Sequence, residues 1–129
     1  MPVLDSPLVM VVDDEPDLMN MIVMYLKLWK FRVEGYTDPL EALESFRQNP
    51  STYSLILTDI RMPYMNGIEL ACKILAIRSD VKVVIMTAYE SNAESLAENL
   101  PMLKHNDILK KPFRLAEICQ SVKKQLQTA

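Results

Sequence analysis

The stretch LVMVVDDE (residues 8–15) decides the fold, because five apolar residues run directly into three acidic ones. A short, continuous apolar block that ends in turn-forming acids is typical of a strand buried on both faces. Pro16 suits the first turn of a helix, and Leu18, Ile22, Leu26 and Trp29 then recur at helical spacing. The chain therefore begins with a buried strand that feeds a helix.

The same alternation of apolar block and helical stripe continues along the chain. Further strands are expected at 31–33, 55–57, 81–86 and 108–109. Helical stripes are expected in four further segments: Leu40, Leu43 and Phe46 after the cap Asp38; Ile68, Ala71, Cys72 and Leu75 after Asn66; residues 91–100; and Leu115 to Leu126 after Pro112. Strict alternation predicts a doubly wound α/β domain, (βα)5, in which helices cover both faces of a parallel five-stranded sheet.

Length and composition favour one domain over residues 1–129, with a core of about 7–127. No apolar run approaches the roughly 20 residues of a membrane span, and the first residues lack the pattern of a signal peptide, which predicts a cytoplasmic protein. The net charge of −3, with scattered Lys and Arg, argues against nucleic-acid binding by this domain. Cys72 and Cys119 are expected to be buried free thiols.

Polar side chains follow four of the predicted strands at the point where each strand ends. Asp13 and Asp14 follow the first, Asp59 follows the third, Thr87 follows the fourth, and a Lys-Lys-Pro segment, residues 110–112, follows the fifth. Taken alone, each has an ordinary reading as a turn residue, a strand end or a surface charge. Ligands of open α/β sheets bind outside the carboxyl ends of the strands, so these side chains should meet in one crevice.

Three carboxylates brought together repel one another, which calls for a cation. Mg²⁺ prefers oxygen ligands and often uses only one or two carboxylates with waters and a phosphate; Mn²⁺ accepts similar ligands. Asp59 needs no general base to act as a nucleophile, because a carboxylate is ionised at neutral pH. His105, the one histidine, is expected in an exposed loop.

These motifs resemble those of the receiver domain of two-component response regulators. The matching stretches are VVDDE (11–15), LTDIRMP (57–63) with Asn66-Gly67 after it, MTA (86–88) and KPF (111–113), in that order. The resemblance implies a flavodoxin-like fold with strand order 2-1-3-4-5. It also implies that Asp13, Asp14, Asp59 and the backbone carbonyl of Arg61 hold Mg²⁺.

The resemblance further implies that Asp59 accepts a phosphoryl group from the phosphohistidine of a sensor histidine kinase or a phosphotransfer protein. Lys111 would contact the phosphoryl group, and Thr87 would be the switch hydroxyl. The family usually has an aromatic residue where this chain has Ile108, so the usual aromatic half of the switch is missing. Tyr89 is hypothesised to shield the acyl phosphate and lengthen its life, and the side chain of Arg61 is a second candidate tuning residue.

A receiver of this kind is a signalling switch and not an enzyme that turns over a separate substrate; only self-phosphorylation and slow self-dephosphorylation are expected. Its output would pass to a downstream protein or an attached effector domain, with dimerisation on phosphorylation as one expected outcome.

Three other readings stay open on sequence alone. A phosphatase of the haloacid-dehalogenase type also uses a strand-end Asp but needs a second Asp where this chain has Arg61. A flavin or nucleotide binder would need a phosphate-binding loop in place of Asp13-Asp14-Glu15. A degenerate receiver would keep the fold and serve only as a docking module.

Overall fold

The computed structural model describes residues 7–87, 108–110 and 113–127. Their elements, in chain order, are β1 Leu8–Val12, α1 Pro16–Leu28, β2 Arg32–Tyr36, α2 Pro39–Gln48, β3 Tyr53–Asp59, α3 Gly67–Ile77, β4 Lys82–Thr87, β5 Ile108–Lys110 and α5 Leu115–Gln127. The helix expected over residues 91–100 and the loop with His105 lie outside the described residues.

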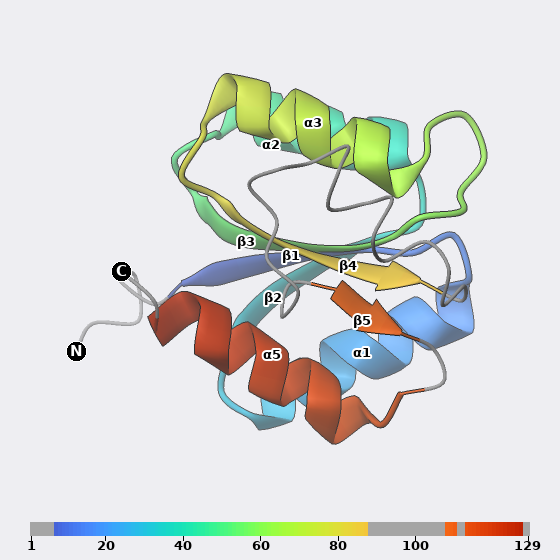
Figure 1. Cartoon of the computed structure of the whole chain (residues 1–129), viewed down its shortest axis with the longest axis vertical. Coiled ribbons are helices and arrows are strands. Elements are labelled where there is room, and N and C mark those ends of the chain that lie inside the picture. The colour runs from blue at the N-terminus through green and yellow to red at the C-terminus, as the bar shows by residue number, and fades with distance from the viewer. Residues whose placement is uncertain (1–6, 88–107, 111–112, 128–129) are drawn as a thin grey trace.

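The five strands form one parallel sheet in the order β2-β1-β3-β4-β5, which confirms the predicted topology. Helices α2 and α3 cover one face of the sheet, and α1 and α5 cover the other (Figure 1). Because β1 lies between two strands and two helical layers, all five of its residues are buried, as the apolar run predicts. β2 lies at the edge, where Val33 is buried and Glu34 is exposed.

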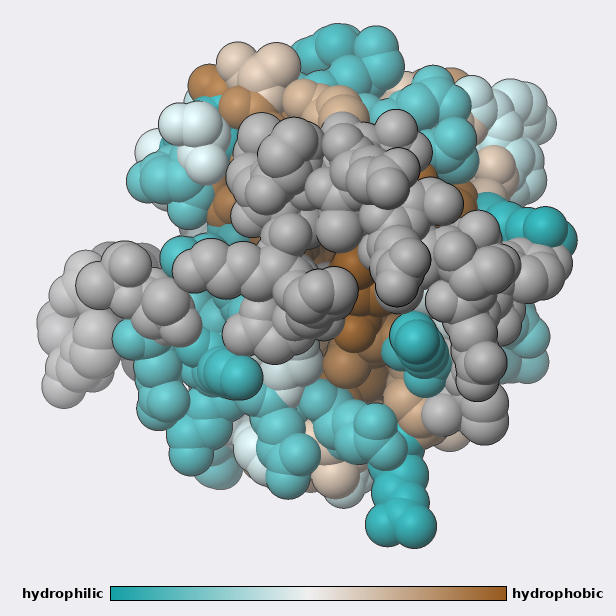
Figure 2. Space-filling view, in the orientation of Figure 1, coloured by the Kyte–Doolittle hydropathy of each residue, from teal (hydrophilic) through white to brown (hydrophobic). Residues whose placement is uncertain are grey.

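The core has two main parts that lie on opposite faces of the sheet, because successive strand residues point to opposite faces. Met10 and Val12 of β1 pack with the α2 and α3 layer, whereas Val9 and Val11 pack with the α1 and α5 layer. On the face seen in Figure 2, hydrophilic residues predominate over α5, and a narrow apolar strip shows where β5 lies. Within the described residues, no helix combines the length and the apolar character that a membrane crossing requires.

Some predicted burial is wrong. Cys72 is exposed, whereas Cys119 is fully buried, and burial raises the pKa of the Cys119 thiol to about 11. Leu40 is 46% exposed, because Ala42, Leu43 and Phe46 form the buried side of α2 instead. The sequence also places Met10, Met21 and Met86 at core-like positions; Met10 and Met86 are buried, but Met21 is 52% exposed. In each case the exposed residue lies on a helix, as predicted, but the buried side of that helix does not extend as far as the residue.

A hydrogen-bonded network fastens α2 to the sheet. The hydroxyl of Ser45 lies 2.8 Å from that of Tyr36 and 2.7 Å from that of Tyr53, and Tyr53 donates to Oε1 of Glu34 at 2.7 Å. Burial raises the pKa of Tyr53 above its ordinary value, so the phenol stays protonated and keeps donating. The network therefore ties the ends of β2 and β3 to α2 through satisfied polar groups.

Candidate functional site

The carboxyl ends of β1 and β3 bring three carboxylates together. Asp13, Asp14 and Asp59 each place a carboxylate oxygen within 4.8 Å of the others. The register explains this, because Val12 pairs with Thr58, so Asp13 and Asp59, the next residues, lie side by side at the carboxyl ends of β1 and β3. The sequence prediction that these acids converge is confirmed by this geometry.

The three acids differ in exposure. Asp13 is 1% exposed and Asp59 is 9% exposed, whereas Asp14 is open to solvent. Oδ1 of Asp13 accepts a hydrogen bond from the backbone N–H of Glu15 at 2.9 Å, and Oδ1 of Asp59 accepts one from the N–H of Ile60 at 2.9 Å. These bonds orient the two buried carboxylates, and Asp14 leaves the site open to water and ligands.

The backbone of Asp13 is also held from the edge of the sheet. Its N–H donates to the carbonyl of Tyr36, the last residue of β2, at 3.1 Å. The sequence does not predict this role for Tyr36, because any residue type has a backbone carbonyl that can accept such a hydrogen bond.

Gly67 is the second residue that sequence reasoning undervalued. Its N–H donates to the carbonyl of Ile60 at 2.8 Å. A Cβ atom at this position would lie 1.9 Å from the backbone oxygen of Asp59, so only glycine allows α3 to start so close to β3. A glycine directly after the helix cap Asn66 is the signal that pointed to such a close approach.

The loop between Gly67 and β3 makes a tight turn at the rim of the site. The N–H of Met65 donates to the carbonyl of Pro63 at 2.8 Å, across Tyr64, whose φ is 73°. A bulky residue in this left-handed region is strained. Tyr64 is also 86% exposed, so its side chain gains little from packing.

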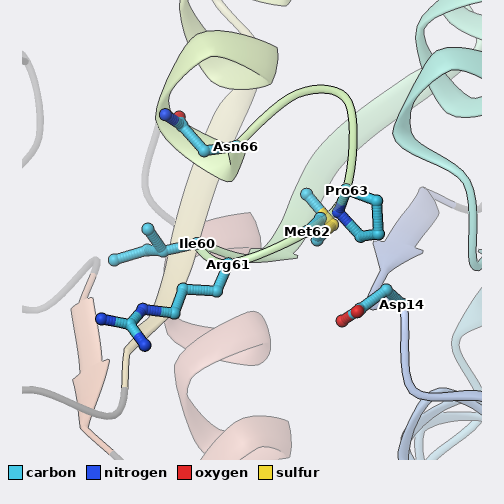
Figure 3. Close-up of a pocket in the computed structure, with 6 residues that line it drawn as sticks. All are labelled: Asp14, Ile60, Arg61, Met62, Pro63 and Asn66. Carbon is cyan, nitrogen blue, oxygen red and sulfur yellow. The ribbon is translucent and has the colours of Figure 1, made fainter.

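A pocket of about 510 Å³ opens beside the carboxylates (Figure 3). It is lined by Asp14, Ile60, Arg61, Met62, Pro63 and Asn66. In Figure 3 the guanidinium group of Arg61 points away from Asp14, so this arginine does not cover the carboxylate of Asp14. The pocket offers room for water or a small phosphorylated ligand next to Asp14.

The other predicted site residues fall in different places. Thr87 is the last residue of β4, is 1% exposed and pairs with Lys110 of β5, so it lies at the same end of the sheet as Asp59. Ile108 begins β5, is half-buried and pairs with Ile85. Lys111 and Tyr89 lie outside the described residues.

The fold and the placement of Asp13, Asp59 and Thr87 agree with a family match over most of the chain. Residues 9–123 match the family model of the response regulator receiver domain. The chain belongs to this family. It is a receiver domain of the kind that acts in two-component signalling, and receiver domains of this family serve as signalling switches.

Two curated relatives illustrate the range of proteins that carry this domain. The chain is 30% identical to the response regulator receiver protein CpdR of Brucella abortus over 121 residues, which cover 94% of this chain and 98% of the relative. It is 34% identical over 122 residues to the transcriptional regulatory protein PrrA of Mycobacterium tuberculosis, covering 95% of this chain and 51% of the relative. The chain thus spans about half the length of the second relative.

A solved structure supports the same assignment. The response regulator protein TrrA of Thermotoga maritima, in complex with Mg²⁺ and BeF, superposes with a TM-score of 0.77 at 27% identity. The match covers 92% of this chain and 98% of that chain. The receiver fold therefore extends over nearly the whole of both chains.

Proposed function

We propose that this receiver domain accepts a phosphoryl group on Asp59 with Mg²⁺ held by Asp13, Asp14 and Asp59. The observation that carries the proposal is the cluster of three carboxylate oxygens within 4.8 Å of one another. An all-oxygen, acidic donor set that is partly open to water fits Mg²⁺, and the backbone carbonyl of Arg61 is proposed as a fourth ligand. When bound, Mg²⁺ supplies positive charge next to the oxygens of the phosphoryl group in transfer.

The proposed reaction needs no general base. A carboxylate oxygen of Asp59 attacks phosphorus, a new O–P bond forms, and the P–N bond of a donor phosphohistidine breaks. The imidazole leaves with the bonding electron pair and takes a proton from solvent. The hydrogen bond from the N–H of Ile60 to Oδ1 helps to orient this carboxylate for the attack.

Lys111 and Thr87 are proposed to contact the phosphoryl group, as the family resemblance implies. Thr87 is suited to a switch role because it is buried at the end of β4, so movement of its hydroxyl also moves the chain that follows. Ile108 is proposed to transmit this change in place of an aromatic residue. Arg61 and Tyr89 are proposed to tune the rates at which phosphate is gained and lost.

The proposed partners are a sensor histidine kinase or phosphotransfer protein as donor, and a downstream protein or attached domain as target. The name of PrrA describes a transcriptional regulatory protein. A transcriptional output of this chain would require a further domain.

The direct test is the intact mass of the protein after incubation with acetyl phosphate and Mg²⁺. We expect one added phosphoryl group that is labile to base and absent from Asp59→Ala. An Asp59→Ala protein that still gains the group would place phosphorylation elsewhere. No gain in the wild-type protein, when Mg²⁺ binding is demonstrated, would favour a docking module or a strict requirement for a protein donor.

A second measurement tests the metal separately from the phosphoryl transfer. Mg²⁺ at about one hundred times its dissociation constant should raise the free energy of unfolding by about 2.7 kcal/mol. Asp14→Asn should remove most of this gain, because Asp14 contributes one of the clustered carboxylates. Asp17→Asn is the matched control, since Asp17 is an exposed acid in the first turn of α1 outside the cluster. Equal Mg²⁺ stabilisation of both variants in urea unfolding would contradict the assignment.

A further inference from the structure

The outer face of α1 is unusually apolar for a surface helix. Among the described residues, seven large hydrophobic side chains are exposed, and three of them lie on α1, with Trp29 directly after it. Met21 is 52% exposed, Met24 64% and Leu28 69%. A helix on the surface of a soluble domain normally turns polar residues outward. We call Met21, Met24 and Leu28 the α1 stripe.

The α1 stripe has the spacing of a helix–helix seam. Met21, Met24 and Leu28 follow one another at intervals of three and four residues. At 3.6 residues per turn they fall within an arc of about 60°. Apolar residues at intervals of three and four are the pattern that packs against a second helix in coiled coils.

The charges at the two ends of α1 have opposite signs. Glu15 and Asp17 are exposed at the N-terminal end, and Lys27 and Lys30 are exposed at or just beyond the C-terminal end. A second α1 helix lying antiparallel therefore presents lysines to these acids and acids to these lysines. A parallel helix would oppose like charges. The helix dipoles favour the antiparallel arrangement as well.

We infer that the α1 stripe is a self-association surface on which a second copy of this chain docks with its α1 antiparallel. A two-fold axis between Met21 and Met24 places Met21 of each copy opposite Met24 of the other. The same axis brings Asp17 of one copy opposite Leu28 and beside Lys27 of the second copy. The surface thus supplies its own complement in charge, and the same residues serve on both copies, as an isologous interface requires.

The small area of the α1 stripe limits the affinity of the dimer. Three apolar side chains with flanking charges bury less than the roughly 800 Å² per partner of a standard interface. The dimer is therefore weak and forms at high protein concentration. It depends on the surface of α1 and not on phosphorylation of Asp59, so it can be measured on the unphosphorylated protein.

The test is sedimentation equilibrium of the unphosphorylated chain between about 10 µM and 1 mM, the range in which weak complexes form. We expect the weight-average mass to rise from that of the monomer, 14.8 kDa, toward twice this value. Met24→Lys should hold the mass at the monomer value across the range. Ile77→Lys is the matched control, because Ile77 is 40% exposed at the end of α3, and it should associate as the wild type does.

Charge reversal tests the antiparallel orientation. Asp17→Lys and Lys27→Asp should each weaken association at least about tenfold in Kd, a loss in the range of close charge pairs. The two changes combined should restore most of it, because the ends again carry opposite charges. Circular dichroism of each variant separates loss of association from loss of folding, and Leu28→Lys replaces Met24→Lys if that variant unfolds.

Two results would overturn the inference. A monomer at every concentration would assign the α1 stripe to the helix of a different protein. Association that survives Met24→Lys, or that the combined charge reversal fails to restore, would place the contact on another surface or in another orientation.

Discussion

Helices α1 and α3 both begin at the candidate site, yet they begin in different ways. The start of α3 is fixed by a side-chain cap, because Oδ1 of Asn66 accepts from the N–H of Glu69 at 2.8 Å, and by the close approach of Gly67 to Asp59. The start of α1 has Glu15 at the cap position, and within the described residues that side chain makes no capping hydrogen bond. The two helices occupy equivalent positions after neighbouring strands of the sheet.

The two helix starts therefore form two different sides of the candidate site. Close backbone approach at the start of α3 fixes the position of Asp59 at the end of β3. The start of α1 instead carries exposed acids whose charges are available to a cation. The candidate site therefore has one side held by backbone contacts and one side formed by exposed acids.

The largest expected effect is that of substituting Gly67. Gly67→Ala forces a Cβ against the backbone oxygen of Asp59, at 1.9 Å, and backbone has no easy way to move. We expect it to lower the free energy of unfolding by about 1–3 kcal/mol and to slow phosphorylation of Asp59. Urea unfolding and the acetyl phosphate assay measure the two effects.

Gly35→Ala is the matched control on the α1 side. There a Cβ would meet the side-chain atoms of Met19 and Val23, at 2.2 and 2.9 Å, and the flexible methionine can move aside. Alanine also gains about 0.5–1 kcal/mol over glycine in a strand, so the net change should be small. Equal losses in the free energy of unfolding for Gly35→Ala and Gly67→Ala would contradict the view that α3 starts in a rigid position and α1 in an open one.

The capping residues give a smaller effect of the same sign. Asn66→Ala should cost about 1 kcal/mol, because the N–H of Glu69 loses its acceptor. Glu15→Ala should change the free energy of unfolding by less than about 0.5 kcal/mol, as expected of a surface position that makes no cap. A cost at Glu15 as large as that at Asn66, in thermal or urea unfolding, would show that α1 is anchored as firmly as α3.

The smallest effect should be an increase in the free energy of unfolding on substitution of Tyr64, in the loop before α3. Tyr64→Asn should raise the free energy of unfolding by up to about 1 kcal/mol, because asparagine tolerates the left-handed backbone that Tyr64 adopts at φ 73°. Tyr64→Ala keeps a Cβ in the same conformation and should leave the free energy of unfolding within a few tenths of a kcal/mol. Stabilisation by both substitutions would trace the gain to removal of the exposed ring and not to the backbone.

Much of the fold and the acidic cluster could be predicted from the sequence, because both depend on local patterns. Apolar blocks that end in Asp13 and Asp59 give the strands and place the acids at one edge of the sheet. Which residues of a helix are buried does not depend on the local sequence alone. Cys72 lies next to the buried Ala71 on α3 and is nevertheless exposed, because neighbouring elements decide where burial stops.

Backbone-mediated contacts were equally hard to predict. The carbonyl of Tyr36 and the close approach of Gly67 depend on how strands and helices meet, and neither residue carries a reactive side chain. The sequence places Met21 of α1 in the core for a related reason, although the residue is exposed. An apolar residue at helical spacing predicts a contact, but the spacing does not say whether the contact lies within the chain or with a second molecule.

The hydrogen bond from the N–H of Asp13 to the carbonyl of Tyr36 couples the site to the edge of the sheet. That amide exchanges with solvent deuterium only when the end of β2 separates from β1, so its exchange rate reports the free energy of this local opening. Edge strands are the parts of a sheet that open most readily. If Asp13 holds Mg²⁺ as proposed, fraying of β2 should weaken that binding, although β2 contributes no carboxylate to the cluster.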